Sequence, residues 1–148
     1  MKKYLMLVSL LFAILLSACA PQITEDPSTA GLPDGISIKV DTESITPEGA
    51  SFILFHPTEM HIQYGDDYKL QKLQNSQWED VPTIIDHYAF NAIAYELPKN
   101  TPTELEIDWT WLYGSLPAGE YRLVKECMDF HSTGDYDLYT VSAAFIVK

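Results

Sequence analysis

Basic residues are scarce in this chain of 148 residues, because 9 Lys and Arg stand against 21 Asp and Glu for a formal charge of −12. Binding to nucleic acid depends on clustered Lys and Arg, so we expect no nucleic-acid partner. A helical period is also absent after residue 20, which argues against a helical fold. Two cysteines in the whole chain are too few for a disulfide framework. The apolar fraction of 47% nevertheless predicts a folded domain rather than a disordered chain.

The N-terminus has the pattern of an export signal. Met1-Lys2-Lys3 is followed by an almost unbroken apolar run over residues 4–16. A basic start, a short apolar run and small residues are typical of a secretory signal peptide, here residues 1–18. The run is well short of the about 20 residues that a membrane-spanning helix needs.

Leu16-Ser17-Ala18-Cys19 resembles the lipobox of bacterial lipoproteins. The resemblance implies that the thiol of Cys19 accepts a diacylglycerol and that cleavage leaves Cys19 as the new N-terminus. A thiolate is the nucleophile that such a transfer requires. The alternative is an ordinary signal peptide whose cleavage site includes a cysteine.

Cleavage before Cys19 would leave 7 basic and 21 acidic side chains, a charge of −14. An anionic membrane surface would repel such a domain, so the lipid on Cys19 must supply the attachment. We therefore expect a lipid-anchored protein on the extracytoplasmic face of the cell membrane. Cys127 would then be a lone thiol, and the neighbouring Glu126 and Asp129 would raise its pKa. It is interpreted as a small buried apolar residue.

A linker follows the lipidation site. Residues 20–35 contain three Pro, two Gly and three acidic residues, a composition typical of a tether. At about 3.1 Å per residue the extended segment would span roughly 50 Å. The predicted organisation is a signal peptide at 1–18, the lipidated Cys19 and linker at 19–35, and one domain at 36–148.

The domain reads as β-structure throughout, in about seven to nine short strands separated by turn signals. Alternation is clear over residues 36–41, 60–64 and 139–147, whereas residues 51–55 form a continuous apolar run. This pattern predicts an all-β fold, an antiparallel two-sheet β-sandwich. A small closed barrel is the alternative.

Three further segments shape the prediction. The clearest alternation covers residues 104–111, which places Trp109 and Trp111 on the core face of one strand. Residues 81–91 have no clean period and are predicted as a long loop or one short helical turn. Residues 132–137 (STGDYD) are predicted as a loop.

The segment Leu116 to Leu123 (LPAGEYRL) resembles the entry to a late strand of an immunoglobulin-like sandwich. In such sandwiches a Tyr soon after a Gly turn forms a tyrosine corner, and Tyr121 fits that role. Residues 36–148 further resemble a bacterial immunoglobulin-like domain family found in lipoproteins of Gram-positive bacteria. The matching stretches are residues 44–50, 64–68, 78–82, 109–114 and 116–123. The resemblance implies the fold and carries over no catalytic residue.

Side chains that could support chemistry are few. Cys127 and His131 are the only close nucleophile and base pair, and no signature surrounds either. His56 and His61 flank a Pro and are interpreted as exposed turn residues rather than zinc ligands. We predict no enzyme activity, no cofactor and no metal site. Whether the acidic pairs Asp66/Asp67 and Asp135/Asp137 bind calcium stays open.

These features predict a membrane-anchored surface lipoprotein whose Ig-like domain is a non-catalytic binding or interaction module. The partner would be an envelope protein or a cell-wall glycan. One alternative is a protease-inhibitor-like or sensor accessory module that uses residues 81–91 and 130–137 as contact loops. Another is a carbohydrate- or cell-wall-binding module. Tyr88, Tyr113 and Tyr136 are predicted to lie in loops and are candidates for a binding surface, because Tyr is enriched in recognition loops.

Overall fold

The structure is a computed structural model that describes residues 35–148. This part of the chain forms nine β-strands and one short helix. Their bounds are β1 (Ser37–Val40), β2 (Gly49–Phe55), β3 (Ile62–Tyr64), β4 (Lys69–Gln74), β5 (Gln77–Asp80), β6 (Tyr95–Glu96), β7 (Thr103–Asp108), α1 (Thr110–Tyr113), β8 (Gly119–Ser132) and β9 (Asp135–Val147). No helix within residues 35–148 has the length and apolar character needed to span a bilayer. The expected signal peptide, Cys19 and almost all of the linker lie outside the described residues.

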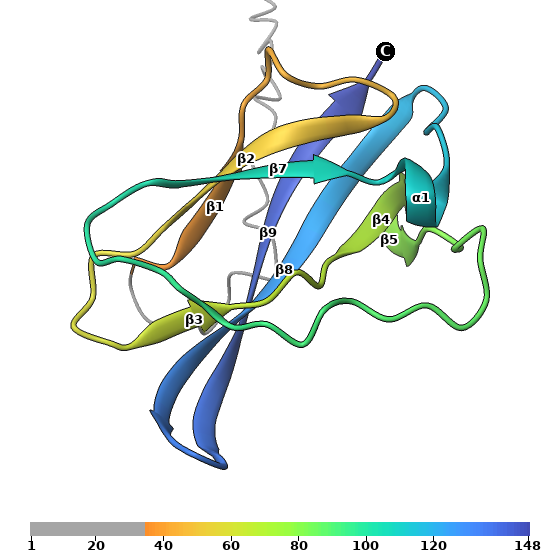
Figure 1. The fold of residues 1–148 in the computed structure, drawn as a ribbon. Helices are drawn as coiled ribbons and strands as arrows, with labels where there is room; N and C mark the ends of the chain where they lie inside the picture. Colours follow the sequence, from red (N-terminus) through yellow and green to blue (C-terminus); the bar gives the residue numbers. More distant parts are fainter. Residues whose placement is uncertain (1–34) are drawn as a thin grey trace, which may run out of the picture.

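The strands form two antiparallel sheets that pack face to face (Figure 1). The small sheet has the order β1-β2-β7. In the large sheet β8 is central. One edge of β8 pairs with β4 and then β3, and the other edge pairs with β9 along almost its whole length. The predicted antiparallel β-sandwich is thus confirmed, and the strands of the described residues do not close into a barrel.

Aromatic rings from both sheets form the centre of the core. Phe145 of β9 stacks on Tyr121 of β8, with 5.9 Å between ring centroids, and meets Phe52 of β2 edge to face at 5.9 Å. These residues point inward because strand side chains alternate between the two faces of a sheet. Burying one large apolar side chain stabilises a fold by roughly 1.5–3 kcal/mol, so this cluster is a main source of stability.

The strand predicted over residues 104–111 is shorter than expected. β7 ends at Asp108, and the single helical turn α1 follows. The Asp108 carboxylate accepts hydrogen bonds from the backbone N–H and the hydroxyl of Thr110, at 2.8 and 2.5 Å, which turns the chain out of the extended conformation. Trp109 remains fully buried, and its indole N–H donates to the carbonyl of Pro47 at 2.9 Å.

Trp111 does not lie in the core, so the prediction for this residue was wrong. Helical geometry replaces the two-residue period, and two positions after Trp109 the side chain faces outward with 43% of its surface exposed. Leu112 and Tyr113 take the inward positions instead. Tyr113 is therefore a buried helix residue rather than a loop residue.

The segment 81–94 has no regular structure, and it crosses beneath β7 as a long loop (Figure 1). It is held at defined points. The N–H of Ile84 donates to the carbonyl of Leu112 at 2.9 Å, and the side-chain amide of Asn91 donates to Asp66 at 2.9 Å. The long loop that the sequence predicted is confirmed, in preference to a helical turn.

The loop predicted at residues 132–137 is a tight hairpin. β8 continues to Ser132 and β9 begins at Asp135, so only Thr133 and Gly134 form the turn. Gly134 has φ of +80°, a conformation that costs glycine little. Tyr136 consequently lies in β9, on the end of the hairpin that extends beyond the sandwich (Figure 1).

Candidate functional site

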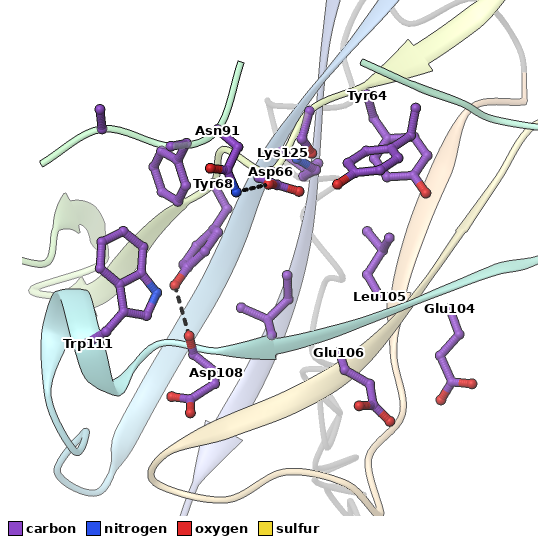
Figure 2. A pocket seen from close by; sticks show the side chains of 15 residues that line it. Tyr64, Asp66, Tyr68, Asn91, Glu104, Leu105, Glu106, Asp108, Trp111 and Lys125 are labelled. Carbon is purple, nitrogen blue, oxygen red and sulfur yellow. Dashed lines mark hydrogen bonds between the residues drawn. The ribbon is translucent and has the colours of Figure 1, made fainter. Parts of the chain in front are cut away.

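A groove of about 550 Å³ lies between β7 and residues 89–91 of the long loop (Figure 2). One wall is β7, and all five residues from Glu104 to Asp108 line the groove. Leu105 and Ile107 lie on the inner face of the strand, whereas the carboxylates of Glu104, Glu106 and Asp108 point to the opposite face (Figure 2). The other wall combines aromatic and polar side chains. Its members are Tyr64, Asp66, Tyr68, Phe90, Asn91, Tyr95 and Trp111.

One edge of β7 borders this groove and has no partner strand among residues 35–148, because β7 pairs only with β2. The N–H of Trp109 donates to the carbonyl of Glu48, just before β2, at 3.1 Å. The Asp108 carbonyl belongs to the same peptide bond as this N–H and points in the opposite direction, away from β2. The Tyr68 hydroxyl accordingly donates to that carbonyl at 3.3 Å. Since strand backbone groups alternate in direction, the N–H and C=O groups of Glu104 and Glu106 also point to the open edge.

Aromatic rings gather at one end of the groove. Phe90 meets Trp111 edge to face, with 5.4 Å between ring centroids, and lies tilted against Tyr68 at 5.3 Å. Tyr88 packs against Phe90 at 5.8 Å. Tyr88 and Trp111 remain exposed at the surface. Exposed aromatic clusters of this kind are common in recognition surfaces.

The floor of the groove contains a buried cation. Lys125 has only 2% of its surface exposed, and its ammonium donates to the backbone carbonyls of Gly65 and Asp67 at 2.6 and 2.5 Å. Burial lowers the pKa of Lys125, while the carboxylates of Asp67 and Asp66 act in the opposite direction. The ammonium also lies 5.8 Å from the centre of the Tyr64 ring. Lys125 therefore fixes the turn that shapes the groove.

Sequence reasoning missed both the groove and Lys125. The available signal was the position of Lys125, which lies in phase with the inward residues Tyr121 and Leu123 of β8. A Lys at an inward strand position needs acceptors, because a buried ammonium is unfavourable without them. The residues that supply them lie about 60 positions earlier in the chain, beyond any local pattern.

Cys127 and His131 do not form a catalytic pair. Cys127 is buried, and this burial raises its pKa to about 12, which suppresses the nucleophilic thiolate. His131 lies on the exposed part of the hairpin, where its ring pairs with Asp137 at 3.2 Å. That hydrogen bond is the main cause of the raised pKa of His131.

His56 and His61 lie in different environments and do not form a common site. His56 is buried, contrary to the expected exposed turn residue, and its ring nitrogens contact Thr58 at 3.1 Å and the carbonyl of Leu97 at 2.7 Å. His61 pairs with Glu96 at 2.5 Å on the surface. Across residues 35–148 no group of three or more His, Cys, Asp or Glu side chains is arranged to hold a metal ion.

The inhibitor-like alternative requires residues 81–91 and 130–137 to form one contact surface, but these two segments lie side by side over only part of their length. A smaller pocket of about 360 Å³ lies between Asn91 and Ile93 of the long loop and Tyr136 and Leu138 of the hairpin. The tip of the hairpin lies beyond this pocket. Of the tyrosines predicted for a loop surface, Tyr88 alone lies in a loop, since Tyr113 belongs to α1 and Tyr136 to β9.

Tyr121 has the geometry of a tyrosine corner. Its hydroxyl donates to the carbonyl of Pro117, four residues upstream, at 2.9 Å, and its ring is buried against Phe145. Gly119 lies between the two residues, at the start of β8. This corner closes the turn into the central strand of the large sheet, and Tyr121 does not line the groove.

The chain matches the bacterial Ig-like domain family over residues 33–146, which covers the whole sandwich apart from Val147, the last residue of β9. Neither the comparison with curated proteins nor that with solved structures gives a match. The family match agrees with the two antiparallel sheets and with the corner at Tyr121. This protein therefore belongs to the bacterial Ig-like domain family.

Proposed function

We propose that this protein is a bacterial surface lipoprotein, anchored through Cys19, whose Ig-like domain is a non-catalytic module that binds its partner at the β7 groove. The observation that carries the binding role is the open β7 edge beside an aromatic groove of about 550 Å³. Ig-like sandwiches serve widely as interaction modules, although fold alone does not define a partner. An envelope protein is the favoured class of partner.

The anchor is supported by the sequence Leu16-Ser17-Ala18-Cys19 directly after the apolar run. Two or more acyl chains hold a protein stably at a membrane, whereas one chain is marginal. The roughly 50 Å reach of an extended linker would allow the groove to meet partners away from the lipid surface.

The anchor is tested by expressing the full chain in bacteria fed an alkyne-labelled fatty acid. We expect label and membrane retention in the wild type and in Cys127→Ala, and neither in Cys19→Ala. Cys127→Ala is the matched control because it removes the other cysteine of the chain. Equal labelling of the Cys19→Ala protein would refute the anchor.

The binding role is tested by immobilising the chain and passing solubilised envelope proteins and digested cell wall over it. We expect a retained component that is lost when the groove is altered by Trp111→Ala. Ile146→Ala, a change of an exposed β9 residue outside the groove, is the control. Retention of nothing by the wild-type chain, or identical retention by both variants, would contradict a binding function at this groove.

A carbohydrate-binding role is the second candidate, and the exposed Trp111 beside Tyr88 favours it. Exposed aromatic faces are suited to stacking on sugar rings. Cell-wall fragments at millimolar concentration would then quench or shift the tryptophan emission of the wild type but not of Trp111→Phe. Unchanged emission in the wild type would exclude this candidate.

A further inference from the structure

We propose that the open edge of β7 accepts an extended segment of a partner protein as a fourth strand of the small sheet, and that this segment alternates basic and apolar residues. This inference rests on the proposed function, because it names the class of partner that the binding groove takes. It is argued from the backbone direction of β7, from the two faces of that strand and from its charge.

The backbone of β7 offers hydrogen-bonding groups at the regular spacing that a new strand requires. The N–H and C=O groups of Glu104 and Glu106 point to the open edge, and no strand of residues 35–148 pairs with them. Paired strands lie about 4.8 Å apart, and the groove begins directly at this edge. The long loop passes the same region without pairing to β7, so the small sheet stops at three strands.

The two faces of β7 define the side chains of an added strand. On the outer face Glu104, Glu106 and Asp108 are exposed, so Lys or Arg residues of the partner would lie directly across from carboxylates. On the inner face the neighbours are Leu105 and Ile107, with Phe90 and Trp111 beyond, so apolar residues would enter the groove. Cross-strand neighbours of opposite charge favour pairing, and like charges oppose it.

A second copy of this chain fits the edge poorly. Pairing β7 with β7 would place two rows of acidic residues against each other, and acidic edges are a known device against such association. The linker is disfavoured for the same reason, because residues 20–35 carry Glu25, Asp26 and Asp34 and no basic residue. Charge complementarity therefore favours a basic segment of a different protein.

The test uses the full chain in detergent and a nine-residue probe peptide of alternating Lys and Val. We expect binding that weakens at high salt, with slowed amide exchange in residues 103–108. A block peptide with the same composition but no alternation should bind at least tenfold more weakly. We expect an equally large loss of affinity for a Lys-Val peptide in which the amide nitrogens that face β7, those of alternate residues, are methylated. This methylation removes the hydrogen bonds to β7 and keeps the charge of the peptide.

Two charge-reversal variants distinguish a local effect of the β7 edge from an effect of the overall negative charge. Glu106→Lys should weaken binding of the Lys-Val peptide at least tenfold and should strengthen binding of a Glu-Val peptide. Glu120→Lys changes the net charge equally at an exposed position of β8, in the other sheet, and should change the affinity less than twofold. Equal effects of the two variants would overturn the proposal, as would a block peptide or an N-methylated peptide that binds as tightly as the alternating Lys-Val peptide.

The remaining outcomes distinguish this inference from the broader function. A chain that ignores the Lys-Val peptide but retains an envelope protein or glycan through Trp111 refutes strand addition and leaves the binding function standing. A chain that retains nothing refutes both. Dimerisation of the free chain that is sensitive to Glu106→Lys would assign the edge to a second copy and would also overturn the proposal.

Discussion

The ring of Phe145 stacks on the indole of Trp109, with 5.3 Å between their centroids and 23° between their planes. Phe145 belongs to the large sheet, and Trp109 is the first residue after β7 of the small sheet. This stack therefore connects the two sheets at the point where the chain leaves β7. It holds Trp109 inside and, through the helical turn that follows, directs Trp111 outward to the groove.

Truncation of the two tryptophans should destabilise the fold to very different extents. Trp109→Ala removes a fully buried ring, and we expect it to lower the free energy of unfolding by roughly 3–5 kcal/mol. Trp111→Ala should lower it by less than about 1 kcal/mol, because the ring is half exposed. Urea unfolding followed by circular dichroism measures both values. Similar losses for the two variants would contradict the placement of these residues.

The tyrosine corner predicts a smaller effect. Tyr121→Phe keeps the buried ring but removes the hydrogen bond to the Pro117 carbonyl, so we expect a loss of about 1 kcal/mol in the free energy of unfolding. Tyr136→Phe removes a hydroxyl from an exposed tyrosine and should have no measurable effect. Thermal unfolding of the two variants in parallel provides the comparison, and equal midpoints would argue against the corner.

Lys125 should contribute to stability as well as to the shape of the groove. Lys125→Met fills similar space but leaves the carbonyls of Gly65 and Asp67 without their donor, which we expect to cost roughly 1–3 kcal/mol. Amide hydrogen exchange should become faster at residues 65–68 before it changes elsewhere. Lys39→Met replaces an exposed Lys on β1 and serves as the control. A Lys125→Met protein as stable as the control would show that the ammonium is dispensable.

The buried thiol of Cys127 predicts a specific pH dependence. Its pKa is raised to about 12 in the folded chain from an ordinary value of 9.0. Between these values the unfolded state releases the proton while the folded state retains it. The stability associated with Cys127 is therefore complete below pH 9 and is lost as the pH rises toward 12, by at most about 1.4 kcal/mol per unit.

Urea unfolding of the wild type and Cys127→Ala from pH 8 to 10.5 isolates this contribution, because other titrating groups affect both proteins alike. Above pH 9 we expect the free energy of unfolding of the wild type to fall relative to that of Cys127→Ala. Parallel curves over the whole range would show that Cys127 titrates normally.

The sandwich was predictable because its long strands alternate cleanly. Val141, Ala143, Phe145 and Val147 all face the core, as their two-residue spacing indicates. The alternation rule failed after Asp108, because a short segment with apolar residues at positions 109 and 111 is compatible with a strand and also with a helical turn. The local hydrogen bonds from Asp108 to Thr110 decide between the two conformations, and their strength is not visible in the hydrophobic pattern.

The groove was not predictable for a different reason. It depends on which strand of the small sheet lies at the edge and on where an irregular loop crosses, and both are set by contacts between distant segments. The loop itself was recognised by its lack of period. Its role as a groove wall follows only when Phe90 meets Trp111, about 20 residues later in the chain.

The order of the small sheet also determines how the domain would carry a mechanical load. If the N-terminus is anchored and a partner binds β7, as proposed above, force would enter at β1 and at the opposite edge of the small sheet, with β2 between them. β1 meets β2 over four paired positions, whereas β2 meets β7 over six. In single-molecule pulling β1 should therefore detach first, as a short extension before the main rupture. The large sheet, with its long β8–β9 hairpin, lies outside this line of tension and would keep its shape while β1 yields.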